Sequence, residues 1–221
     1  MKRGGAIKQP YDRVLVVCEG AKTEPNYLHE IRRAERLASA YVRIIPSELG
    51  TDPLKIVESA IAEFERTRAF DKVFVVFDRD DHLGYANAIA KAQAKDKKLK
   101  NDERKPVGFE AVVSVPSFEL WLLLHFHDQQ AWLHRDEALH RLRQHIPGYA
   151  KSMDDTFAKT KEYLDVATAR ASCLKARNSR LPGEEAYTDV HELVAALTSF
   201  GLGRGNFLWK GRSELCESNL S

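Results

Sequence analysis

The sequence lacks any apolar run long enough to cross a membrane. A transmembrane helix needs roughly 20 consecutive apolar residues, whereas the longest candidate, Leu120 to Leu124, is interrupted at His125. The first ten residues, MKRGGAIKQP, are basic but contain no apolar segment of the kind that a secretory signal requires. These absences predict a soluble, cytoplasmic protein that has no membrane partner.

Cysteine is also scarce. The chain has only Cys18, Cys173 and Cys216, which are far apart and form no CxxC pair. An odd number of widely spaced cysteines argues against both a disulfide framework and a zinc knuckle. We therefore expect reduced thiols, with Cys18 buried at the end of an apolar segment.

Two further absences concern ligands. No GxGxxG or GxxxxGK[ST] motif occurs at a strand-to-helix turn, which argues against a nucleotide-binding protein of the doubly wound type. The formal net charge is only +2, so a nucleic-acid site would need a locally basic face. Residues 91–105 and 170–180 are rich in lysine and arginine and could form such a face, or could be ordinary solvated surface.

Four short apolar segments alternate with segments of helical spacing in the first part of the chain. The apolar segments are rich in β-branched residues, which is typical of buried strands in a parallel sheet. The predicted strands are residues 13–18, 41–46, 72–77 and 109–115, and the predicted helices are residues 24–38, 53–64, 85–95 and 118–126.

This alternation predicts an α/β fold for residues 11–127, with a four-stranded parallel sheet and helices on both faces. The remainder, residues 128–221, has helical segments and no strong strand, so we expect a helical C-terminal region. Its predicted helices are residues 135–145, 155–176 and 190–200.

Acidic residues follow two of the predicted strands. Glu19 comes after the first strand, and Asp78 and Asp80 come after the third. Because the carboxyl ends of parallel strands meet at one edge of a sheet, these carboxylates should converge there. Mg²⁺ prefers oxygen ligands of this kind. The alternative is that the aspartates only form turns or cap a helix, for which aspartate is also favoured.

Three segments of the chain resemble the RloB family of Toprim proteins: VLVVCEGAKTEPNYL (14–28), FVVFDRDDH (74–82) and SVPSFELWLLLHF (114–126). The later segment YTDVHELV (187–194) is also similar to that family. The resemblance implies a Toprim-like, Rossmann-like domain with a glutamate after the first strand and Asp-x-Asp after the third. It also implies a setting in restriction and phage-defence loci, often beside an ATPase of the ABC type.

By position, the resemblance makes Glu19, Asp78 and Asp80 the catalytic residues and ligands of Mg²⁺ or Mn²⁺. In Toprim nucleases of the overcoming-lysogenization-defect type, further acids follow the first glutamate and the fourth strand. Glu24 and Glu119 could fill these places and hold a second ion, although Glu24 lies one residue further along than in that pattern. Glu119 could instead be an acid that the helix dipole favours at a helix N-terminus.

Three other residues are candidates for supporting roles. Lys22, in the loop after Glu19, could contact a substrate phosphate or could be a solvated lysine. His82 and His125 could donate a proton to a leaving oxygen. His125 lies in an apolar helical segment, however, and a structural role there is the favoured interpretation.

The sequence thus predicts a Mg²⁺-dependent nuclease of phage defence that cuts DNA or RNA, including tRNA, under the control of an ABC-type ATPase. Hydrolysis is favoured because the chain has no room for the additional domains of topoisomerases and primases. The alternative is a non-catalytic Toprim scaffold that binds nucleic acid or regulates the ATPase. An oligomer is compatible with either interpretation.

Overall fold

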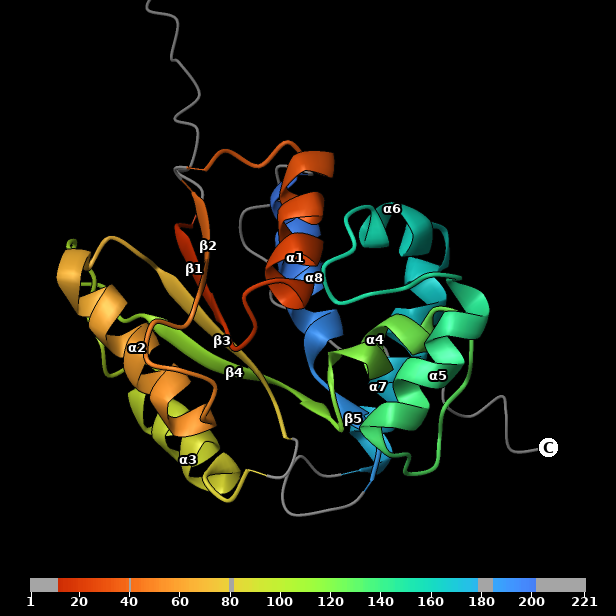
Figure 1. Cartoon of the computed structure of the whole chain (residues 1–221). Coiled ribbons are helices and arrows are strands. Elements are labelled where there is room, and N and C mark those ends of the chain that lie inside the picture. The colour runs from red at the N-terminus through yellow and green to blue at the C-terminus, as the bar shows by residue number, and fades with distance from the viewer. Residues whose placement is uncertain (1–11, 40, 80–81, 179–184, 202–221) are drawn as a thin grey trace, which may run out of the picture.

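Fully apolar segments form the centre of the sheet. In this computed structural model, which describes residues 12–39, 41–79, 82–178 and 185–201, every residue of strand β1 is buried. The strands are β1 (Val14–Cys18), β2 (Val42–Pro46), β3 (Lys72–Asp78), β4 (Gly108–Val115) and β5 (Tyr187–Thr188). The helices are α1 (Thr23–Ala34), α2 (Pro53–Thr67), α3 (Tyr85–Lys95), α4 (Phe118–Leu124), α5 (Arg135–His145), α6 (Thr156–Thr160), α7 (Leu164–Arg177) and α8 (Val190–Gly201), with a 3₁₀ turn, η1 (Lys161–Tyr163), before α7 (Figure 1).

The sheet has the order β2-β1-β3-β4-β5, and its first four strands are parallel. The α/β class is therefore confirmed, but the prediction of four strands is wrong. The fifth strand comes from the region that was expected to be helical, and it pairs antiparallel with the end of β4. It is only two residues long, too short to produce the alternating pattern by which a strand is recognised in a sequence.

Helices cover both faces of the sheet, as predicted. Because side chains alternate along a strand, Leu15 and Val17 of β1 point to one face and Val14, Val16 and Cys18 to the other. The first face packs against α2 and α3, and the second packs against α1, α4 and α8. Figure 1 shows these two layers on opposite sides of the strands.

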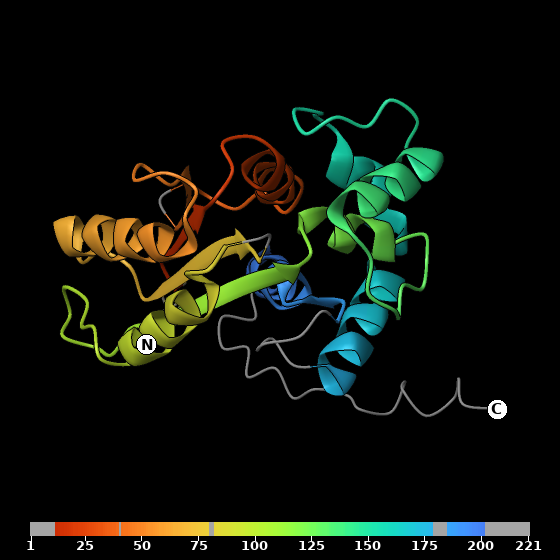
Figure 2. The same ribbon diagram turned by 60° about the horizontal axis from the view of Figure 1, so that its bottom comes forward.

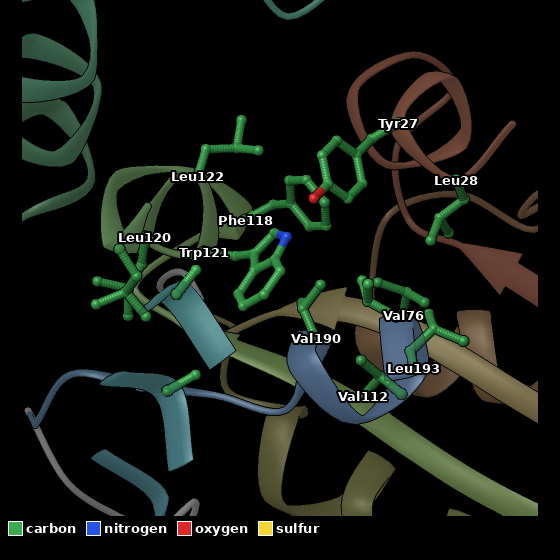
Figure 3. Close-up of a cluster of buried hydrophobic side chains, with 14 of the residues drawn as sticks. Tyr27, Leu28, Val76, Val112, Phe118, Leu120, Trp121, Leu122, Val190 and Leu193 are labelled. Atoms are coloured by element: carbon green, nitrogen blue, oxygen red, sulfur yellow. The ribbon is translucent and has the colours of Figure 1, made fainter. Parts of the chain in front are cut away.

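The C-terminal helices share one apolar cluster with the second face of the sheet. Figure 3 shows Val190 and Leu193 of α8 beside Val76 and Val112 of the sheet, with Trp121 of α4 next to them. The last helix thus packs against strands that come much earlier in the chain. The predicted division of the chain after residue 127 stays a prediction.

A buried carboxylate joins α1 to α6. Glu30 of α1 accepts hydrogen bonds from the backbone N–H groups of Thr156, Phe157 and Ala158, at 3.1, 3.0 and 3.2 Å. These are N–H groups of a first helical turn, which lack partners within their own helix. Glu30 thereby fixes the start of α6 against the sheet-covering helix α1.

The cysteines agree only in part with expectation. Cys18 is a buried free thiol, as predicted. Cys173 is disulfide-bonded, so the expectation of a reduced thiol is wrong for that residue. As for membranes, none of the helices in the described part of the chain is long and apolar enough to span a bilayer.

Candidate functional site

Glu19 and Asp78 meet where strands β1 and β3 end. The backbone N–H of Glu19 donates to the carbonyl of Val76 at 2.8 Å, which extends the pairing of the two strands by one step. The Glu19 side chain then turns back, and its Oε2 accepts a hydrogen bond from the backbone N–H of Asp78 at 2.8 Å. The predicted convergence of these two acids at the carboxyl edge of the sheet is therefore observed.

Glu24 lies in the first turn of α1 and is only 5% exposed. Its carboxylate rests on Gly20, and a methyl group added to Gly20 would overlap Glu24 Oε2. The absence of a side chain at Gly20 therefore lets the Glu24 carboxylate turn back toward the end of β1. A carboxylate in this first turn is also favoured by the helix dipole.

Glu119 occupies the corresponding first turn of α4 and is 3% exposed. Its Oε2 accepts a hydrogen bond from Ser117 Oγ at 2.7 Å. Its Oε1 is buried and has no hydrogen-bond partner among the residues that the structure describes. The Lys151 ammonium lies beside this oxygen, with Nζ 4.0 Å from Oε1. One carboxylate oxygen thus remains available to a ligand.

These carboxylates face one cavity of about 340 Å³. In Figure 2 the arrowheads of the central strands point toward the helices of residues 118–177, and residues on both sides line the cavity. The lining residues are Glu19, Gly20, Ala21, Lys22, Thr23, Glu24, Thr51, Asp78, Phe118, Glu119, Arg135 and Lys151. The predicted residues Glu19, Lys22, Glu24, Asp78 and Glu119 therefore come together. The remaining predicted ligand, Asp80, lies outside the described residues.

Two basic residues at the cavity were not foreseen. Arg135 begins α5, and Lys151 lies in the turn before α6, where its carbonyl accepts a hydrogen bond from Thr23 Oγ1 at 3.1 Å. Both come from the region beyond residue 127 and follow no motif in the sequence. Only the tertiary structure places them beside the acids.

The two candidate histidines have different surroundings. His82 Nε2 lies 3.9 Å from Glu19 Oε1, close to the acidic group. His125 is 1% exposed, and its Nδ1 lies 3.0 Å from the carbonyl oxygen of Trp121. Burial lowers the pKa of His125 to about 4. These contacts favour the structural role for His125.

The cavity crowds like charges into a poorly solvated space. Burial, together with the negative charges of Glu19 and Glu119 and against the opposing effect of Lys151, raises the pKa of Glu24 to about 7. Burial also raises the pKa of Asp78 well above its usual range, with added repulsion from Glu24, Glu19 and Glu119. Carboxylates that repel one another in this way are stabilised by a cation.

The donor set of the cavity fits a hard divalent ion. All the candidate ligands are carboxylate oxygens, and Glu119 Oε1 is buried without a partner in the described part of the chain. Among the described residues, no three His, Cys, Asp or Glu side chains are grouped closely enough to hold a metal by themselves. Mg²⁺ does not require this, because it usually binds one or two carboxylates and keeps several waters. Mn²⁺ suits the same oxygen ligands.

Comparison with known proteins gives one family. The family model described as RloB-like protein matches residues 14–197, a range that contains every cavity-lining residue named above. No curated protein and no solved structure matches the chain.

Proposed function

Because this chain belongs to the RloB-like protein family, we propose that its acidic cavity is the active site of a Mg²⁺-dependent nuclease. The enzyme hydrolyses phosphodiester bonds of DNA or RNA, and residues 11–127 form its Toprim-type catalytic part. Mn²⁺ can replace Mg²⁺.

The observation that carries this proposal is the convergence of four acids from four places in the chain. Glu19 and Asp78 lie at strand ends, and Glu24 and Glu119 lie in first helical turns, yet all four line the same cavity. Helix capping or turn formation can explain why a single acid stands at a given position. It gives no reason why four acids should line the same cavity. Burial of these charges together is unfavourable unless protons or cations neutralise them.

The residues divide into two roles. Glu19 and Asp78, with Asp80, would hold one ion, and Glu24 and Glu119 would hold a second, so that neither ion needs three of the described carboxylates. When bound, the ion stabilises negative charge on phosphoryl oxygens and lowers the pKa of a coordinated water. Lys22, Arg135 and Lys151 line the same cavity and bind the substrate phosphates. His82, whose Nε2 lies 3.9 Å from Glu19 Oε1, would donate a proton to the leaving oxygen.

The biological setting proposed here rests on the resemblance of the sequence to this family. The nuclease acts in phage defence, and an ABC-type ATPase holds it inactive until infection. The nucleic acids that we propose as substrates include tRNA. Such control is needed because an unrestrained nuclease would damage its own cell.

The proposal is tested by cleavage of plasmid, single-stranded DNA and total tRNA in Mg²⁺ or Mn²⁺. Wild type is compared with Glu19→Gln and Asp78→Asn, which keep side-chain size but remove charge. The matched control is Glu162→Gln, which makes the same change at an exposed glutamate of η1. We expect the first two variants to lose at least about 100-fold in rate, since even groups around metal ligands typically contribute 10- to 100-fold.

Absence of cleavage by the folded wild type requires a second arm, with the ATPase and its nucleotide added. Cleavage that appears only then is expected for a partner-gated nuclease. Continued inactivity in both arms would contradict catalysis and favour the alternative, a non-catalytic Toprim scaffold.

A further inference from the structure

A half-exposed tryptophan lies in the loop that leads to the cavity. Trp132 is 51% exposed, in contrast to Trp121, which is fully buried. Leu133 is 3% exposed and belongs to the apolar core, so it anchors the loop at that point. Trp132 and His134 flank this anchor, and their rings lie edge to face with centroids 6.3 Å apart. The two rings therefore form a small aromatic surface that the core does not use.

This aromatic surface is continuous in sequence with the cationic part of the cavity wall. Arg135 follows His134 directly and lines the cavity, which also contains Lys22 and Lys151. His134 Nδ1 accepts a hydrogen bond from the backbone N–H of Asp136 at 3.2 Å, so the ring is fixed to the start of α5. Proteins usually bind unpaired nucleotides with aromatic side chains that stack on the bases, next to cationic side chains that follow the nucleic-acid backbone.

The depth of the acids independently restricts the substrate. Glu24 and Glu119 are 5% and 3% exposed, so a phosphate must enter the cavity to approach them. A cavity of about 340 Å³ is at the small end of ligand sites and has room for about one nucleotide. A base-paired duplex is stiff and wide, so its backbone fits such a space less readily than a flexible strand does. A strand without a partner can bend into it.

We infer that the substrate of this site is a single-stranded nucleic acid, and that Trp132 stacks on a base next to the nucleotide that enters the cavity. The inference rests on the proposed function for the location of the scissile phosphate. The inference adds to that function that the substrate is single-stranded and that Trp132 recognises it. Stacking on Trp132 does not depend on base identity, because every base has an aromatic face.

Binding is measured with the full chain in Ca²⁺, which neutralises the carboxylates as a hard cation, and the probes are checked for intactness after each measurement. The probes are fluorescein-labelled single strands of DNA and of RNA, each of about 12 nucleotides to span a typical site, and the corresponding duplexes. Trp132→Ala is compared with wild type. The matched control is Tyr41→Ala, which removes an aromatic that is 38% exposed at the start of β2, on the opposite edge of the sheet. Trp132→Phe preserves an aromatic face.

We expect single strands to bind more tightly than duplexes, and Trp132→Ala to weaken single-strand binding roughly 10-fold. Tyr41→Ala and Trp132→Phe should retain most of the affinity. Binding should also quench tryptophan fluorescence in wild type but much less in Trp132→Phe. A preference for DNA or for RNA identifies which single strand is the natural ligand.

Wild-type affinity of Trp132→Ala, or duplexes that bind as tightly as single strands, would overturn the inference. No binding of any probe would overturn it as well. The proposed function has a separate readout, since it fails only when metal-dependent cleavage is absent both without and with the ATPase and its nucleotide. Stacking without cleavage would thus support the inference and contradict the nuclease, whereas cleavage without stacking would do the reverse.

Discussion

At the scale of single residues, Gly20 and Glu24 depend on one another. The Glu24 carboxylate occupies the space that a side chain at Gly20 would fill. We expect Gly20→Ala to displace Glu24 and to weaken Mn²⁺ binding about 10-fold or more, as disturbed ligand positioning typically does. Isothermal titration calorimetry measures this affinity.

A double-mutant cycle provides the control for this prediction. If the methyl group acts by displacing Glu24, Gly20→Ala should have little further effect in a Glu24→Ala background. Additive losses of affinity in the two single variants would instead mean that the added methyl group perturbs the loop by another route.

The raised pKa of Glu24 makes stability depend on pH. Its value is 4.5 ordinarily and about 7 in the folded protein. As pH rises through this window, the unfolded state ionises first, so the metal-free protein loses stability. The loss is complete above pH 7 and is on the order of 3 kcal/mol. Urea unfolding in EDTA at pH 5.5 and pH 8 should show lower stability at pH 8.

Glu24→Gln removes the charge and should reduce this pH dependence, with Asp78 contributing the remainder, whereas the exposed Glu162→Gln should leave it unchanged. Mg²⁺ should stabilise the wild type more at pH 8 than at pH 5.5, because the ion competes with protons for the carboxylates. Equal stability of the metal-free wild type at the two pH values would contradict a raised pKa of Glu24 in the folded protein.

At the scale of elements, the carboxylate of Glu30 holds the start of α6. Glu30→Ala leaves three N–H groups at a buried helix start without their acceptor, so we expect a loss of about 3 kcal/mol in unfolding free energy. Asp52→Ala is the comparison, because Asp52 caps the more exposed start of α2 by accepting from Leu54 and Lys55 N–H groups. A cap of that kind contributes about 1 kcal/mol.

Equilibrium urea unfolding of both variants checks the difference. Glu30→Ala should be clearly the less stable of the two. Equal losses would mean that Glu30 acts as an ordinary cap and contributes nothing as a link between α1 and α6.

The elements differ in how well the sequence predicts them. The strands β1, β3 and β4 and the helices α2 and α3 were located within a few residues, because their apolar periodicity is strong. The predicted helix 155–176 is divided into α6, η1 and α7. The helix α6 is only five residues long and is capped by Glu30 from a distant part of the chain, which no local pattern reveals.

At the scale of the whole molecule, the last helix completes the core of the first half. The residues Val190, Leu193, Val194 and Leu197 of α8 are buried in the cluster that covers the second face of the sheet. We therefore expect a fragment of residues 1–127 to lack a cooperative fold, since it would expose this face. Near-ultraviolet circular dichroism and thermal unfolding of the fragment test the expectation.

The full chain provides the control for these measurements. A sharp unfolding transition in the isolated fragment would contradict the expectation. It would instead support the predicted division into two independent regions after residue 127.

Only the sheet side of the candidate site could be predicted from the sequence. Strand-end acids such as Glu19 and Asp78 follow from the rule that parallel strands end at a common edge. Arg135 and Lys151 do not follow from any rule, because their approach depends on how the later helices pack. Glu24 and Glu119 are predicted from the family resemblance. The periodicity of the sequence alone does not predict that they meet the strand-end acids.

Lys151 is synthesised well after the strand-end acids that it faces across the cavity. The acids at the ends of β1 and β3 leave the exit tunnel first, and the segments that supply Lys151 and α8 follow much later. The nascent chain therefore holds an unfinished pocket until these later segments have emerged. A ligand that needs the whole cavity should therefore bind only after these later helices have packed against the sheet.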